Sequence, residues 1–166
     1  PVWYQKHMSH HLLPGMDTAW IHRLHNIFLV REPAGVVASY LRSRDTVAPA
    51  DIGLPQQAAL YDELAAAGRP PTVVDAGDFL ADPEGHLRAL CAELGIGFTP
   101  AMLAWPAGPR DSDGVWAPYW YDTVWRSTGF EPPSARPLPR LEGDALAVAE
   151  ACRPAYERLH ALRLRP

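Results

Sequence analysis

The sequence lacks a basic excess and a long apolar run, and each absence excludes a class of protein. A helix that spans a membrane needs about 20 consecutive apolar residues, and no stretch of the 166 residues approaches that length. The formal net charge is −4, whereas proteins that bind nucleic acids usually carry a strong basic patch. We therefore expect neither a membrane-spanning protein nor a nucleic-acid-binding protein.

Cysteine is scarce, with only Cys91 and Cys152 in the chain. Both lie within apolar patterns of helical period, so buried free thiols are a simpler interpretation than a disulfide. Free thiols persist in reducing compartments, and we therefore expect a cytoplasmic protein.

Proline, by contrast, is abundant. The 18 prolines cluster at 100–118 and 132–139, which predicts ordered loops there rather than regular elements. The length suits one domain with a hydrophobic core, so we expect a single domain over residues 1–166. Because Val2, Trp3 and Tyr4 resemble a strand already under way, we also expect the start of this domain to lie upstream of Pro1.

Strand-like and helix-like segments alternate along the chain. Strands are predicted at 2–5, 26–30 and 72–75. Helices are predicted at 17–23, 55–67, 82–95, 114–127 and 141–151, and a further helix begins at Pro33. A break near Pro154 precedes a last helix. The run from Asn26 to Val30 is apolar throughout, as in a strand buried on both faces of a parallel sheet. This alternation predicts a three-layer α/β/α fold with a mainly parallel sheet.

The segment around Arg31 has the residues of a phosphate site. The predicted strand delivers Arg31 to the carboxyl edge of the sheet, where open α/β folds bind ligands. The helix from Pro33 directs free N–H groups and its dipole toward the same edge, and Ser39 offers a hydroxyl two turns later. The alternative is that Arg31 pairs with Glu32 and that Ser39 is a small packing residue.

The pattern Arg31-Glu32-Pro33, with Ser39 eight positions after the arginine, resembles the 3′-phosphate-binding motif of sulfotransferases that use 3′-phosphoadenosine 5′-phosphosulfate. The segment from Asp75 to Gly95 is similar to that family's strand, acidic turn and helix, and Lys6 to Pro14 resembles its Lys-Thr-His segment. The resemblance implies a P-loop-like fold and a site in which Arg31 and Ser39 bind the 3′-phosphate of 3′-phosphoadenosine 5′-phosphosulfate. It further implies transfer from this donor to a small acceptor with a hydroxyl or amine, without a metal ion.

The chain departs from the family pattern at its start. No glycine-rich loop of the kind that holds the phosphosulfate end of the donor occurs in the sequence. We therefore expect a C-terminal part of such a domain, or a protein that has lost activity. An incomplete sheet would expose an apolar edge or face, which favours self-association. Segments at 6–15, 105–116 and 127–130 further resemble a bacterial subgroup of the family.

The sequence offers more than one candidate for the general base and for a further residue that contacts the sulfuryl donor. Sulfuryl transfer needs a base for the acceptor proton, and histidine suits that role near neutral pH. His7, His10 and His11 are the candidates, with His10 and His11 slightly preferred, and their spacing also allows a helical metal site. Arg110 is a candidate phosphate contact in a loop where the family has Arg-Lys-Gly, and Arg126 is a second.

Two other functions stay open on the sequence alone. One is a different P-loop-type phosphotransferase, such as a small-molecule kinase, and the other is a non-catalytic nucleotide-binding or interaction protein on the same fold. The aromatic residues suggest either core packing, which we prefer, or the lining of an acceptor pocket. They are Trp116, Tyr119, Trp120, Tyr121 and Trp125.

Overall fold

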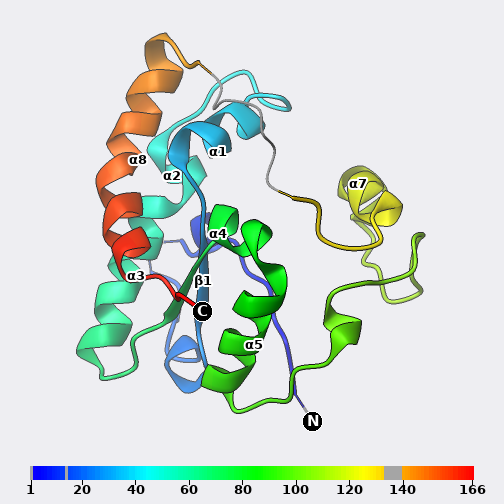
Figure 1. Cartoon of the computed structure of the whole chain (residues 1–166). Coiled ribbons are helices and arrows are strands. Elements are labelled where there is room, and N and C mark those ends of the chain that lie inside the picture. Colours follow the sequence, from blue (N-terminus) through cyan, green and yellow to red (C-terminus); the bar gives the residue numbers. More distant parts are fainter. Residues whose placement is uncertain (1, 14, 133–139) are drawn as a thin grey trace. The chain divides into compact units, whose positions relative to one another are not determined.

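A computed structural model describes residues 2–13, 15–132 and 140–166. The chain forms two compact units, one of Pro1–Ala76 with Ala135–Leu164 and the other of Gly77–Ser134 with Arg165–Pro166 (Figure 1). The expectation of a single domain over residues 1–166 stays a prediction.

The first unit contains a parallel pair of strands. β1 (Ile27–Val30) and β2 (Thr72–Asp75) align in register from the pair Ile27 and Thr72 to the pair Val30 and Asp75. Between them lie α1 (Pro33–Tyr40), α2 (Pro49–Ile52) and α3 (Leu54–Ala66). Parallel strands joined through helices confirm the predicted α/β class.

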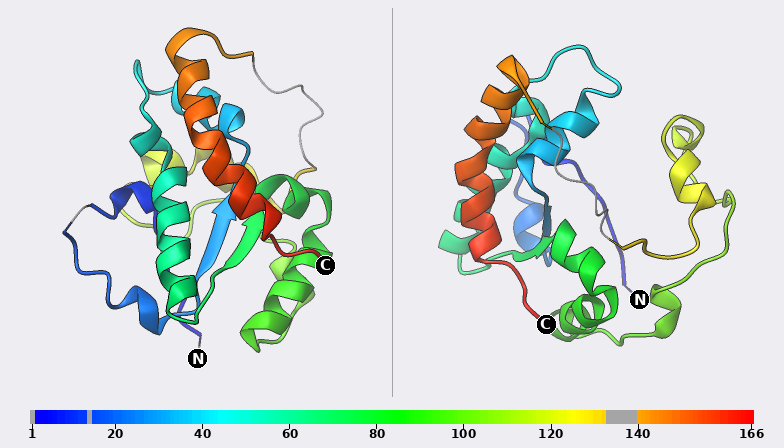
Figure 2. Two further views of the ribbon diagram at one scale, coloured as in Figure 1. Left: turned by 90° about the vertical axis from the view of Figure 1, so that its left-hand side faces the viewer. Right: turned by 45° about the horizontal axis from the view of Figure 1, so that its top comes forward.

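One face of the sheet is packed against two helices. α3 and α8 (Gly143–Ala161) lie across it (Figure 2). The core between them includes Phe28, Val30 and Val73 from the strands, and Leu64 and Leu159, which are fully buried. Burying a leucine of this kind contributes about 1.5–3 kcal/mol. A second cluster, around Val37 of α1, packs on α8.

The other face of β1 carries apolar side chains that stay exposed. Ile27 is 37% exposed and Leu29 is 63% exposed, while the alternate residues Phe28 and Val30 are buried. The expectation of a strand buried on both faces is therefore wrong for β1. Successive strand residues point to opposite faces, and the described part of the chain buries only one of them.

The second unit consists mainly of helices and loops. α5 (Pro83–Leu94) begins where the Asp82 carboxylate accepts a hydrogen bond from the Gly85 N–H and ends at Gly95, whose φ is +66°. The remaining elements are α4 (Ala76–Ala81), the 3-10 turn η3 (Pro100–Met102), α6 (Ala117–Trp120) and α7 (Asp122–Arg126). Phe130 makes edge-to-face contacts with Phe79 and Trp105.

Four predicted elements differ from the structure. Residues 2–5 form no strand, and the helix at 17–23 shrinks to the 3-10 turn η2 (Ile21–Arg23). The helix at 114–127 divides into α6 and α7. Pro154 lies inside α8 without ending it. An internal proline costs a helix one hydrogen bond and a steric clash, and the fully buried Cys152 and Leu159, one on each side of Pro154, hold the helix on the core.

Candidate anion-binding site at the carboxyl end of β1

Arg31 stands at the carboxyl end of the parallel strands. It follows Val30, the last residue of β1, which pairs with Asp75. Its guanidinium lies over Gly35, with Nε and Nη2 3.5 and 3.6 Å from the point that a Cβ on Gly35 would occupy. The side chain is exposed, and within the described residues it forms no hydrogen bond or ion pair. Within the part of the chain that the structure describes, no carboxylate therefore neutralises this planar cation.

Glu32 does not pair with Arg31. Its carboxylate accepts a hydrogen bond of 3.0 Å from the Gly35 N–H and so caps α1. The other carboxylate oxygen lies 3.4 Å from Nη2 of Arg153 in α8. The expected free N–H groups at the start of α1 are thus reduced, because Pro33 has none and the carboxylate occupies that of Gly35. An anion near Arg31 would depend on side chains more than on the helix terminus.

Ser39 has a partner that sequence reasoning missed. Its Oγ accepts a hydrogen bond of 2.6 Å from Nη2 of Arg42. Residues spaced by four share one face of a helix, so Gly35 and Ser39 lie on one side of α1, with Arg31 lying over Gly35. Arg42 reaches Ser39 from just beyond the end of the helix. The spacing of three between Ser39 and Arg42 was the signal that could have found this contact. We call Arg31, Ser39 and Arg42 the α1 face.

Two of the three candidate histidines lie together in the 3-10 turn η1 (Ser9–His11). The rings of His10 and His11 are 4.4 Å apart in an edge-on arrangement. His10 is partly buried, whereas His11 is exposed. Burial lowers the pKa of His10 below its usual value, the neighbouring His11 lowers it further, and Asp51 acts in the opposite direction. His10 is therefore held toward its neutral form.

His7 lies apart from this pair. Its Nε2 is 3.1 Å from the side-chain oxygen of Gln5, and its ring contacts that of Trp20 at 5.0 Å. η1 itself rests on the junction of α2 and α3, where the Ser9 hydroxyl donates to the Gly53 carbonyl at 3.0 Å. α2 contacts both η1 and α1. One short helix thus adjoins both the His10–His11 pair and the helix of the α1 face.

The other basic candidates belong to the second unit. The Arg110 side chain is exposed, and its backbone N–H donates to the Asp113 carboxylate at 2.9 Å. That hydrogen bond, with a second from the Trp125 indole, lowers the pKa of Asp113. Arg126 pairs with Asp122 at 2.9 Å on the surface. A donor contact by Arg110 stays a prediction.

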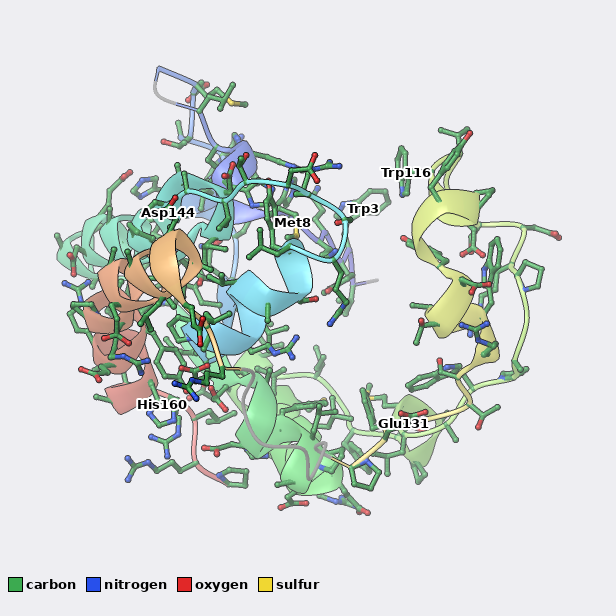
Figure 3. The ribbon with its side chains drawn as sticks, turned by 90° about the horizontal axis from the view of Figure 1, so that it is seen from above. Trp3, Met8, Trp116, Glu131, Asp144 and His160 are labelled. Carbon is green, nitrogen blue, oxygen red and sulfur yellow. The ribbon has the colours of Figure 1, made fainter. Side chains whose placement is uncertain are left out.

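Some of the aromatic residues between 116 and 125 are exposed on the surface, and others pack within a loop. Trp116, which stands just before α6 (Figure 3), is 58% exposed, and Tyr119 is 81% exposed. The preference for core packing is wrong for these two residues. Tyr121 and Trp125 are partly buried, and the Trp125 indole donates to Asp113 at 2.8 Å. The polar tip of this indole therefore anchors the loop.

Two parallel strands joined through helices define an α/β protein, with Arg31 at their carboxyl end and the Ser39 hydroxyl on the helix that follows. The comparisons with known proteins agree with this class. Residues 2–163 match the sulfotransferase domain family, and the chain belongs to that family. No helix among the described residues is long and apolar enough to span a membrane.

Two relatives from Arabidopsis thaliana are similar to this chain. The branched-chain-amino-acid aminotransferase-like protein 2 is 36% identical over 156 residues, which cover 91% of this chain and 27% of the relative. The branched-chain-amino-acid aminotransferase-like protein 1 is 39% identical over 137 residues, covering 81% and 24%. The chain thus spans about a quarter of the length of these relatives. No solved structure gives a significant match.

Proposed function

We propose that this chain contributes the 3′-phosphate half of a donor site for 3′-phosphoadenosine 5′-phosphosulfate, and that its parent protein transfers the sulfuryl group to a hydroxyl or amine of a small acceptor. Membership of the sulfotransferase family supports the reaction type. The observation that carries the proposal is the Arg31 guanidinium, which has no partner among the described residues and lies on the same helix face as the Ser39 hydroxyl.

The chemistry of these groups suits a terminal phosphate. Arginine presents a planar fork of N–H donors that stays charged at any physiological pH, and its bonds to phosphate are charge-assisted. Ser39 accepts from Arg42, so its own hydroxyl proton can point to a phosphate oxygen. With Glu32 held by Gly35 and Arg153, no carboxylate of the described residues pairs with Arg31.

His10 is the best of the three candidate bases. In the transfer, the acceptor oxygen bonds to sulfur, the bond from sulfur to the phosphate oxygen breaks, and adenosine 3′,5′-bisphosphate leaves. The base takes the acceptor proton, so it must be neutral before the reaction. The lowered pKa of His10 favours that form at neutral pH, whereas His7 is engaged with Gln5 and Trp20.

Replacing Arg31 tests the donor site. Calorimetric titration should show that the chain binds adenosine 3′,5′-bisphosphate more tightly than adenosine 5′-monophosphate, which lacks the 3′-phosphate. Arg31→Ala should weaken bisphosphate binding about tenfold or more, because a hydrogen bond to a charged group contributes about 1.5–3 kcal/mol, and should leave monophosphate binding nearly unchanged.

Arg44→Ala is the matched control, because Arg44 is exposed nearby and, among the described residues, its side chain bonds only the Ser43 carbonyl. Equal losses of bisphosphate affinity in the two variants would mean that Arg31 acts only through its positive charge and not as a specific contact. An absence of any preference for the bisphosphate would refute the proposed site.

A further inference from the structure

We infer that Arg42 is a second cationic contact for the 3′-phosphate and makes the site selective for a phosphate dianion. This inference rests on the proposed function and deepens it. It starts from the hydrogen bond of 2.6 Å by which Nη2 of Arg42 reaches the Ser39 hydroxyl. A group bound by Ser39 lies within reach of the guanidinium that already touches the same oxygen.

The geometry leaves both groups free to act on one anion. A hydroxyl can accept one hydrogen bond and donate another, and a guanidinium carries five N–H donors. The described residues engage one donor of Arg42, on Ser39, so its other N–H groups and the hydroxyl proton can bind phosphate oxygens. The arginine therefore need not leave Ser39 when the ligand binds.

The charges match a dianion. A phosphate monoester carries about −1.5 to −2 charges near pH 7, with a second pKa of about 6. Arg31 alone supplies one positive charge, and Arg42 supplies the second at the Ser39 hydroxyl, from just beyond the end of α1. Neither arginine forms an ion pair within the described residues. The site would thus favour the fully ionised phosphate over a neutral hydroxyl and over a singly charged group.

A purely structural role for Arg42 is the competing explanation. A cation at the end of a helix interacts favourably with the helix dipole, and Arg42 follows the last turn of α1. Arg44 provides the comparison, because it is also exposed near that end but, within the described ranges, donates only to the Ser43 backbone carbonyl and not to Ser39. A dipole effect would be similar at both positions, whereas a ligand contact belongs to Arg42 alone.

The test compares Arg42→Gln, Arg42→Lys and Arg44→Gln by calorimetric titration with adenosine 3′,5′-bisphosphate and with adenosine 5′-monophosphate. Arg42→Gln should weaken bisphosphate binding about tenfold, the loss typical of a charge-assisted hydrogen bond, and monophosphate binding less than about twofold. Arg42→Lys should recover part of the loss because it keeps the charge. Arg44→Gln should change neither ligand by more than about twofold.

A pH series separates a ligand contact from a structural role. Wild-type preference for the bisphosphate should fall between pH 7.5 and 5.5, as the 3′-phosphate gains a proton near its second pKa of about 6. In Arg42→Gln this dependence should be flatter, because one of the two matching charges is gone. A role in folding alone would lower the thermal midpoint and leave the slope unchanged.

Failure of the inference and failure of the proposed function give different results. If Arg42→Gln and Arg44→Gln behave alike while Arg31→Ala still abolishes the bisphosphate preference, the role of Arg42 is overturned and the donor site stands. If the wild-type chain does not distinguish the bisphosphate from the monophosphate, both are overturned. A misfolded Arg42→Gln would leave the decision to Arg42→Lys, which should then bind with an intermediate affinity and an unchanged pH slope.

Discussion

At the scale of single residues, availability for a ligand is decided by neighbours rather than by residue type. Arg31 and Arg153 are both arginines, yet Arg153 is held by Glu150 and Glu32, with a raised pKa that comes first from its hydrogen bond to Glu150. Arg31 has no partner among the described residues, because its adjacent carboxylate caps α1. The sequence places Glu32 beside Arg31, but the cap directs that carboxylate away.

The titration of His10 gives a prediction at this scale. Its folded pKa lies below the usual 6.5, so the folded state binds fewer protons than the unfolded state as pH falls through 6.5. Stability should therefore be fully present above that pH and decline as pH falls toward the folded pKa. In His10→Gln the decline should be shallower, measured by urea denaturation at several pH values.

His11→Gln supplies the control for this prediction. Removing the neighbouring charge should raise the NMR titration midpoint of His10, because His11 is the second cause of its lowered pKa. If the His10 midpoint in the wild-type chain is at or above 6.5, the prediction fails. The assignment of His10 as the base would then lose its support.

At the scale of elements, the junction between α2 and α3 depends on one glycine. Gly53 has a φ of +77°, which residues with a side chain rarely adopt. A Cβ there would collide with the Ser9 side chain and lie 3.2 Å from the backbone nitrogen of His10. Glycine thus permits both the turn and the close approach of η1. The position of His10 is linked in this way to the backbone between two helices.

Substituting this glycine tests the link. Gly68 has a similar φ of +74°, with nothing within 4 Å of its Cβ position. Gly68→Ala should therefore show the backbone cost alone, about 1–2 kcal/mol. Gly53→Ala should cost about 1 kcal/mol more, because η1 must also move. Urea denaturation measures the free energy of unfolding of both variants. Equal losses of stability would show that packing of η1 against the junction does not add to the cost.

At the scale of the whole molecule, the exposed face of β1 predicts self-association. Ile27 and Leu29 present apolar side chains on a strand whose only ladder partner in the described residues is β2. Exposed strands of this kind pair readily with other chains. Light scattering of the 166-residue chain should show a mass that rises with concentration, and Leu29→Glu should reduce the rise.

Leu162→Glu is the control, because Leu162 is also about half exposed, at 51%, but lies beyond α8 and outside the sheet. A chain that stays monomeric at all concentrations would contradict the prediction. Equal effects of the two substitutions would show that association does not involve β1.

The sequence by itself determined the α/β class, the parallel strands and the position of Arg31 and Ser39. These depend on local signals, namely an apolar run, a proline at the first helical turn and a fixed spacing of eight residues. The resemblance to sulfotransferases was also visible in the sequence, and the match of residues 2–163 to the sulfotransferase domain family confirms it. Local preferences suffice wherever neighbours in the chain are also neighbours in space.

Only the tertiary structure decided which groups are occupied and which are free. Glu32 binds Arg153 from 121 residues away, and Leu29 is exposed although its sequence neighbours are apolar. The same applies to α8, which continues through Pro154 because its buried face is held on the core. The physical reason is that burial and ion pairing join residues far apart in the chain, and no local pattern records those partners.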